Sequence, residues 1–523
     1  MKITDCRLVF KRNGKLESAV GFDNDWFSLE ISEEARDLGK IYSVNLTANK
    51  KLEPVRLEFY AKEDLLGLSY HANGYQSWSE SPYVDYLSYK KNLSKPIQEI
   101  VRLKWYGDYA FTEDERKKRW MHSHLFINLQ EDGETRLFLG DMKPWDSYTW
   151  FVPDYDKSTI EIISDLEGMT IEETETIEAA VILKTTDERN WLSALGINEQ
   201  DIHKITGWTS WYNYYTGISE EILRHNIMAL HKSGIPMDIF QIDDGYFEAV
   251  GDWLIPNKRF PSGMASLAET IKEHDWTPGI WLAPFVCERE SSIFREKSHW
   301  ILRDSKGKLQ IAGWNPNWSG VFYALDIYNE EVREYLRNVF TAMKQDWGYG
   351  FFKLDFLYAA CLVPQNNKTR AMIMTDAMDL LRDLTDGALF LSCGVPIGPA
   401  MSKCDYCRIG ADISHGMEDG FLKSIGYRER VSTFSALGNI GSRAFLDGRA
   451  FGNDPDVFIL RDTKEIKLSR EEKRILFETN MNNSSLVFFS DDVSIYDEET
   501  KMKVASAFQG FRTDKSALRT NNE

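Results

Sequence analysis

A lysine and an aspartate interrupt an apolar run at residues 350–358, which reads GFFKLDFLY. Lys353 and Asp355 are two positions apart, so on a strand both side chains would point to the same face. A buried strand of an α/β protein normally carries a near-continuous apolar run. Opposite charges inside such a run therefore indicate either a structural ion pair or a functional site.

Carboxylates also close two other strand-like runs. Residues 237–244 (MDIFQIDD) end in Asp243 and Asp244, and residues 406–412 (YCRIGAD) end in Asp412. Recurrence of acids at the ends of separate runs favours a functional site over an isolated ion pair.

Paired carboxylates on either side of a sugar are the usual equipment of glycoside hydrolysis, and Asp355 and Asp412 could form such a pair. The alternative is a divalent cation such as Mg²⁺, which needs only one or two carboxylates and waters. Lys353 would disfavour a cation beside Asp355. The same lysine would keep Asp355 ionised, as a nucleophile requires.

From about residue 200 the sequence alternates between strand-like and helix-like segments, and Ser219 can cap the first helix. Eight such units over roughly 300 residues predict a parallel (β/α)8 barrel, in which active sites lie at the carboxyl ends of the strands. The expected strands are 205–211, 237–244, 277–285, 350–356, 388–394, 406–412, 449–453 and 484–492.

Residues 1–190 are expected to form an antiparallel β-sandwich, because short alternating runs are separated by polar turns such as Arg12-Asn13-Gly14. The polar segment 185–190 (TTDERN) marks the predicted boundary. The predicted domains are therefore the sandwich at 1–190, the catalytic barrel at 191–495, and a short helix and tail at 496–523.

Composition limits the partners. The net charge of −19 argues against nucleic acid or an anionic membrane. The N-terminus shows no apolar signal-peptide core, and no run is long enough to span a bilayer.

We expect no cofactor or metal: Cys404 and Cys407 form a lone CxxC, and His122 and His124 are a weak signal for a metal site. Six scattered cysteines give no disulfide framework, which favours a reducing cytoplasm. A homo-oligomer remains open.

The order of motifs resembles that of the melibiase-like α-galactosidases of glycoside hydrolase family 36. Ten blocks over nearly 400 residues carry this resemblance: HANGYQSWS at 71–79, GWTSWYNYY at 207–215, FQIDDGY at 240–246, GDWL at 251–254, PGIWLAPF at 278–285, YALD at 323–326, KLDFLYA at 353–359, CGVPIGPA at 393–400, RIGAD at 408–412 and NDPDVFILR at 453–461.

The resemblance implies that Asp355 is the nucleophile and Asp412 the acid/base of a retaining hydrolase acting on small galactosides such as melibiose or raffinose. It implies that Trp78 reaches the pocket from the β-domain, although from the residues alone Trp78 would be interpreted as a core tryptophan. The substrate-binding residues that it implies are Trp78, Trp211, Tyr212, Asp243, Asp244, Trp281, Lys353, Cys393 and Arg408. We expect Arg408 to point at substrate or Asp355 rather than to pair tightly with Asp412.

Two departures from the family pattern stand out. The block after Asp412 reads ISHGMEDG, without the aromatic residue expected there, and a C-terminal β-domain is expected to be absent or vestigial. Three other functions remain open: an α-N-acetylgalactosaminidase on the same scaffold, a sugar-binding homologue without catalysis, and a metal-dependent barrel lyase or isomerase.

Overall fold

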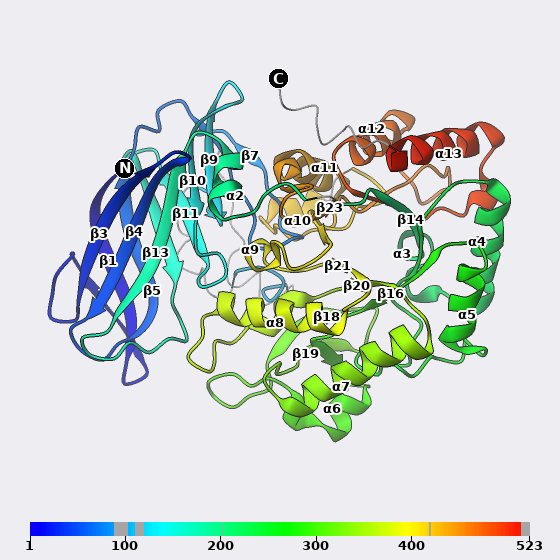
Figure 1. Cartoon of the computed structure of the whole chain (residues 1–523), viewed down its shortest axis with the longest axis horizontal. Coiled ribbons are helices and arrows are strands. Elements are labelled where there is room, and N and C mark those ends of the chain that lie inside the picture. The colour runs from blue at the N-terminus through cyan, green and yellow to red at the C-terminus, as the bar shows by residue number, and fades with distance from the viewer. Residues whose placement is uncertain (88–102, 110–119, 201, 418–419, 514–523) are drawn as a thin grey trace.

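The computed structural model describes residues 1–87, 103–109, 120–200, 202–417 and 420–513. Two antiparallel sheets form its N-terminal part (Figure 1). The first sheet has the strand order β2 (Lys15–Val20), β1 (Lys2–Arg12), β5 (Glu53–Lys62), β12 (Thr159–Asp165), β11 (Thr149–Asp154) and β8 (Ser123–His124). The second has the order β3 (Phe27–Arg36), β4 (Gly39–Ala48), β13 (Thr176–Thr185), β10 (Glu134–Asp141), β9 (Phe126–Glu131), β6 (Ser69–His71) and β7 (Tyr83–Val84).

The two sheets pack face to face because alternate residues of their central strands are apolar. Leu57 and Phe59 of β5 share one buried cluster with Val44 and Leu46 of β4. Side chains two positions apart lie on the same face of a strand, so each strand contributes one apolar face to this core. The predicted two-sheet arrangement of the N-terminal residues agrees with this packing.

Nine parallel strands form the second part of the chain. Their order is β23 (Gly452–Asp454), β22 (Tyr406–Arg408), β21 (Leu389–Ser392), β20 (Phe351–Leu354), β16 (Thr277–Leu282), β15 (Ile239–Ile242), β14 (Ile205–Thr209), β25 (Leu486–Phe489) and β24 (Val457–Phe458). The two end strands, β23 and β24, are separated by only two residues of chain. The sheet is therefore strongly curled, and the Ser485 N–H donates to the Asn453 carbonyl across the remaining gap.

Helices cover the outside of the curled sheet (Figure 1). The main ones are α4 (Glu220–Ser233), α5 (Gly263–Lys272), α7 (Glu330–Thr341), α8 (Arg370–Leu384), α11 (Thr433–Ser442), α12 (Arg470–Asn482) and α13 (Glu498–Thr513). The Ser219 hydroxyl accepts the Ile222 N–H, as predicted for the start of α4. In the described part of the chain, none of the helices combines the length and apolar character needed to cross a bilayer.

The strands end earlier than predicted, which places the acidic residues differently. Asp355 follows the last residue of β20, and Asp412 lies four residues beyond β22. These carboxylates thus belong to the loops at the carboxyl edge of the sheet. Trp211 begins the short helix α3 (Trp211–Tyr214) instead of ending the first strand.

Two further differences concern the end of the sheet and the C-terminus. The predicted seventh strand at 449–453 is displaced and interrupted, forming β23 and β24. The predicted final helix lies within α13, while residues 514–523 fall outside the described part.

A three-stranded antiparallel sheet is inserted between β16 and α7, and the sequence did not predict it. It consists of β17 (Val286–Glu288), β19 (Gly320–Ala324) and β18 (Ile311–Asn315). The turn between β18 and β19 carries Asn317 and Trp318 to the edge where the acidic residues lie.

Candidate active site

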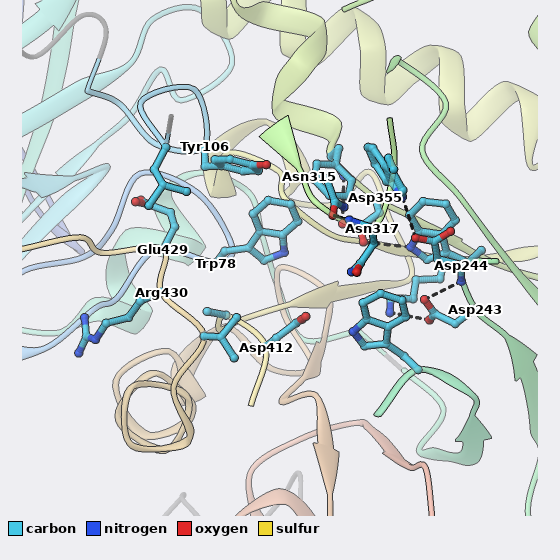
Figure 2. Close-up of a pocket in the computed structure, with 18 of the residues that line it drawn as sticks. Trp78, Tyr106, Asp243, Asp244, Asn315, Asn317, Asp355, Asp412, Glu429 and Arg430 are labelled. Carbon is cyan, nitrogen blue, oxygen red and sulfur yellow. Dashed lines mark hydrogen bonds and ion pairs between the residues drawn. The ribbon is translucent and has the colours of Figure 1, made fainter. Parts of the chain in front are cut away.

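A cavity of about 320 Å³ opens at the carboxyl edge of the curled sheet (Figure 2). This volume lies at the lower end of the range for small-molecule sites, roughly 300–1,000 Å³. Eight of the residues predicted from the sequence line it: Trp78, Trp211, Asp243, Asp244, Trp281, Lys353, Asp355 and Asp412. Three others, Tyr212, Cys393 and Arg408, are buried and are not among the lining residues.

Asp355 is held by two hydrogen bonds. The Trp281 indole Nε1 donates to Oδ2 at 3.0 Å, and the Phe356 N–H donates to Oδ1 at 3.0 Å. Phe356 has a φ of 55°, the left-handed region that an aromatic residue rarely adopts. Backbone strain of this kind concentrates at functional sites. Here it accompanies the sharp exit of the chain from β20.

Removal from water raises the pKa of Asp355 to about 6, although the Lys353 charge and the Trp281 N–H oppose the shift. Lys353 therefore lowers the pKa of Asp355, as expected, but burial outweighs this effect. The Lys353 ammonium itself pairs with Asp243 Oδ2 at 2.8 Å. Burial lowers the pKa of Lys353, but the Asp243 carboxylate together with weaker effects of neighbours such as Asp355 raises it overall.

Asp243 and Asp244 form the floor of the cavity. The Gln241 amide donates to Asp243 Oδ2 at 3.1 Å, and the Asp244 N–H donates to Asp243 Oδ1 at 2.9 Å. The Trp318 indole donates to Asp244 Oδ2 at 2.9 Å. Burial raises the pKa of Asp244 to about 7 against the Trp318 hydrogen bond, and the charges of Asp243 and Asp355 add to the rise.

Arg408 holds Asp412 from behind. Its Nη1 lies 2.9 Å from Asp412 Oδ1, its Nε 3.0 Å from Asp454 Oδ2, and its Nη2 2.8 Å from Asp456 Oδ1. The expectation that Arg408 would avoid a tight pair with Asp412 is wrong, because this buried guanidinium is shared among three carboxylates. The Asp412 side chain remains 35% exposed, so its other oxygen can face a ligand.

Asp456 organises the wall behind Asp412. It accepts hydrogen bonds from the Tyr212 hydroxyl and the Ile413 N–H. Burial raises the pKa of Asp456 to about 7, with Arg408 opposing the shift. Tyr212 and Arg408 were predicted to contact substrate, but they lie in this supporting layer.

Cys393 also lies beneath the cavity. Its N–H donates to the Leu354 carbonyl at 2.8 Å, which joins the end of β21 to the end of β20. Burial raises the pKa of the Cys393 thiol, and the Asp355 charge adds to the rise. The thiol is therefore neutral at physiological pH and packs as a small apolar group.

Trp78 comes from the N-terminal part and is half-buried at the cavity wall. Its ring meets Phe356 edge-on at 5.1 Å between centroids, and a Cβ at Gly394 would lie 2.8 Å from the Trp78 ring. Gly394 therefore provides the space that the indole occupies. The core interpretation of Trp78 from the residues alone is wrong, and the position implied by the family resemblance is the observed one.

Sequence reasoning missed 12 of the 20 residues that line the cavity. The missed residues are Leu103, Tyr106, Asn315, Asn317, Trp318, Phe356, Ala411, Leu422, Tyr427, Glu429, Arg430 and Val431. Phe356 and Ala411 adjoin predicted residues and could have been included on that basis. The polar turn NPNW at 315–318 was a detectable signal, but nothing local placed it beside Asp244.

Within the described residues, one cluster has the composition of a metal site: Asp108, His122 and His124. Both imidazole Nε2 atoms lie within 2.6 Å of the same Asp108 oxygen, Oδ2. These are hydrogen-bond distances, shorter than the roughly 3.3 Å that two ligands bound to one zinc at about 2.0 Å would show. As placed, the trio forms a buried hydrogen-bonded cluster.

Comparisons with known proteins agree on one family. Residues 202–375 match the melibiase family model. The α-galactosidase Mel36A of Lactobacillus acidophilus is 27% identical over 141 residues, 26% of this chain and 18% of that protein. A blood-group A galactosaminidase of Flavonifractor plautii is 26% identical over 134 residues, 24% of this chain and 12% of that protein. The matched stretches thus span about a fifth or less of these two curated relatives.

Solved structures extend the likeness over nearly the whole chain. TtGalA, an α-galactosidase of Thermus thermophilus solved with p-nitrophenyl α-D-galactopyranoside, is 26% identical with a TM-score of 0.74, covering 92% of this chain and 94% of that one. AgaA of Geobacillus stearothermophilus, at 13% identity and a TM-score of 0.58 over 97% of this chain and 75% of that one, shares the fold. The chain is a relative of the melibiase-like α-galactosidases of glycoside hydrolase family 36.

Proposed function

We propose that this protein is a retaining α-galactosidase that removes terminal α-galactosyl residues by double displacement. The observation that carries the proposal is the shared cavity: Asp355 and Asp412, from the ends of two different strands, line it together with Asp243 and Asp244. Asp243 and Asp244 can bind sugar hydroxyls. Asp355 and Asp412, each held by different neighbours, can then act on the glycosidic bond.

In the proposed first step, an Asp355 oxygen attacks the anomeric carbon, and the bond from that carbon to the leaving oxygen breaks. Asp412 gives its proton to the leaving oxygen. Water then attacks the galactosyl–Asp355 ester, Asp412 takes a proton from this water, and the released carboxylate of Asp355 is restored. Trp281 holds the attacking carboxylate at a fixed angle through its N–H.

The floor of the cavity would recognise the galactose ring. Asp243 and Asp244 can accept hydrogen bonds from sugar hydroxyls, and Lys353 can donate one. Trp211, Trp281 and Trp318 add aromatic surface against which a sugar ring can pack. We propose small α-galactosides of the melibiose and raffinose type as substrates; TtGalA has also been solved with stachyose.

The same proposal covers the architecture. β23 and β24 would be two halves of one interrupted strand that completes a (β/α)8 barrel. The catalytic domain would span residues 191–495 between a sandwich at 1–190 and a final helix. A cytoplasmic location remains a proposal from the cysteine content.

An α-N-acetylgalactosaminidase is the second candidate, because one relative carries a galactosaminidase name. A larger group at C2 of the sugar needs space that galactose does not. Comparing p-nitrophenyl α-galactoside with its N-acetylgalactosamine analogue decides between the two activities. A sugar-binding protein without catalysis would turn over neither.

The test of the mechanism is the stereochemistry of the first product. We expect NMR of the released sugar to show α-galactose before mutarotation, and turnover to persist in EDTA. β-Galactose as the first product would refute retention. Loss of activity in EDTA, restored by one specific metal, would instead favour a metal-dependent enzyme.

A further inference from the structure

The cavity has two unlike halves (Figure 2). Asp243, Asp244, Asp355, Asn315 and Asn317 lie together on one side. The opposite side is built from two segments that are remote in sequence. Tyr106, Glu429 and Arg430 lie there (Figure 2), and the segments that carry them, one in the N-terminal part and one in the loop and helix region after Asp412, also contribute Leu103, Leu422, Tyr427 and Val431 to the cavity lining. We call this second set the outer wall.

The charged groups of Glu429 and Arg430, the two ionisable members of the outer wall, bind other protein residues and not the cavity. The Arg430 guanidinium binds both carboxylate oxygens of Glu80, at 2.8 and 2.9 Å, and Figure 2 shows it directed away from the cavity. The Glu429 carboxylate accepts hydrogen bonds from the Ser79 hydroxyl at 2.5 Å and the Tyr109 hydroxyl at 2.6 Å. The charged ends of both side chains therefore anchor the wall to the N-terminal part.

The remaining members of the outer wall offer mostly apolar surface. Val431 is 47% exposed although it lines the cavity, and Leu422 is half-buried there. The Tyr106 hydroxyl donates to the Trp314 carbonyl, so the ring of Tyr106, and not its hydroxyl, is what remains to contact a ligand. Phe421, beside Leu422, is 65% exposed and continues this apolar character onto the surface.

A backbone hydrogen bond connects the outer wall to Asp412, the residue that would protonate the leaving group. The Ser432 N–H donates to the Asp412 carbonyl at 3.0 Å, which holds Val431 next to Asp412 along the wall. An acid/base must face the leaving oxygen. The group attached to that oxygen, the aglycone, therefore extends toward this wall.

We infer that the outer wall is a binding site for an apolar aglycone, so that alkyl or aryl α-galactosides are better substrates than galactosides whose aglycone is another sugar. This inference rests on the proposed function and narrows its substrate class. A sugar aglycone brings hydroxyl groups that need partners when they leave water. An alkyl or aryl group instead gains free energy from contact with Val431, Leu422 and Tyr106.

The test compares methyl α-galactoside, hexyl α-galactoside and melibiose, whose leaving groups are alcohols of comparable acidity. We expect kcat/KM for the hexyl compound to exceed both others by about 10-fold or more, since each buried methylene contributes about 0.8 kcal/mol. In Val431→Ser and Leu422→Ser, the hexyl-to-methyl ratio should fall about 3-fold each. Leu66→Ser, which removes an apolar side chain 86% exposed outside the cavity lining, is the matched control and should keep the ratio.

A hexyl-to-methyl ratio near one, or melibiose as the better substrate, overturns the inference while leaving the proposed hydrolase intact. An unchanged ratio in both serine variants also overturns it. If no α-galactoside, including the p-nitrophenyl compound, is hydrolysed, the proposed function fails and the inference fails with it.

Discussion

Buried charge is arranged in opposite ways at the candidate active site and at the seam between the N-terminal sheets and the curled sheet. In the cavity lining and the layer behind it, six aspartates surround two cations: Asp243, Asp244, Asp355, Asp412, Asp454 and Asp456 around Lys353 and Arg408. At the seam, the buried arginines Arg428 and Arg443 are satisfied chiefly by backbone carbonyls.

Arg443 shows what the seam arrangement achieves. Its guanidinium donates to the Asn73 side chain and to the carbonyls of Gly74, Gln76, Ser77 and Ile409. Burial without a carboxylate partner lowers the pKa of Arg443 to about 9. Four of these five acceptor residues lie between Asn73 and Ser77, so the cation fixes the loop that carries Trp78 and serves structure.

At the cavity the arrangement is the opposite, because acidic side chains outnumber the cations. Burial is the main cause that raises the pKa of Asp355 to about 6 and that of Asp244 to about 7, and neighbouring acids add to both shifts. The charges of Lys353 and Arg408 oppose the shift at Asp355 without cancelling it. Perturbed carboxylates in a cleft are a mark of function. The comparison thus separates charges whose bonds are complete within the protein from charges that retain capacity for a ligand.

Replacing Asp355 should produce the largest effect. We expect Asp355→Gly to lower kcat by on the order of 10⁴-fold or more, because the nucleophile is lost. Azide should restore turnover and give the β-galactosyl azide. The mutant should keep its melting temperature within a few degrees, which distinguishes lost chemistry from lost folding.

Asp412→Gly should spare activated aryl galactosides more than natural ones, because a good leaving group needs little protonation. With azide it should give the α-galactosyl azide. If Asp412→Gly affects both substrate types equally, its assignment as acid/base is wrong.

At the seam, Arg443→Met should act on stability. Removing the guanidinium leaves several buried carbonyls without donors, at a cost of about 3 kcal/mol or more in the free energy of unfolding. Denaturant unfolding measures this. Arg449→Met, which breaks only the ion pair with the largely exposed Glu199, is the control and should cost less than about 1 kcal/mol.

The kinetics of Arg443→Met test its link to the cavity. A released Trp78 loop should raise KM for galactosides in whatever fraction remains folded. A stable Arg443→Met variant with unchanged KM would show that the seam and the cavity are independent.

The sequence predicted the residues of the acidic floor better than the directions in which their partners point. Asp243, Asp244, Asp355 and Asp412 were found because parallel strands bring their carboxyl ends to one edge. The orientation of Arg408 depends on Asp454, which is 46 residues away and lies on a neighbouring strand. No local pattern contains that information.

The rest of the cavity depends on contacts between remote segments. Trp318 lies in the turn between β18 and β19, two strands of a small inserted sheet that interrupts the strand–helix alternation. Glu429 reaches its position through Ser79, which is 350 residues earlier in the chain. Such pairings require the folded structure, so the outer wall could not be predicted from strand ends and motifs.

The smallest expected effect is a shift in the pH profile, and it tests whether the cavity acids act on one another. Asp355 must be ionised to attack, so kcat/KM should fall as pH drops through an apparent pKa near 6. Burial is the main cause of this raised pKa, and neighbouring negative charge adds to it. Asp244, with its pKa raised to about 7, is already largely protonated where the limb falls, so Asp244→Asn removes only part of a charge and should move the acid limb to lower pH by less than about half a unit. Asp462→Asn, at a largely exposed acid paired with Lys473, should leave the limb in place.

The pKa of the acid limb is a property of the coupled group of carboxyls and not of Asp355 alone. A shift in the Asp244 variant therefore shows coupling between carboxyls but does not assign the pKa to one residue. If the limb stays fixed in Asp244→Asn while affinity falls, Asp244 binds substrate without tuning the nucleophile, and the cavity's excess negative charge serves recognition only.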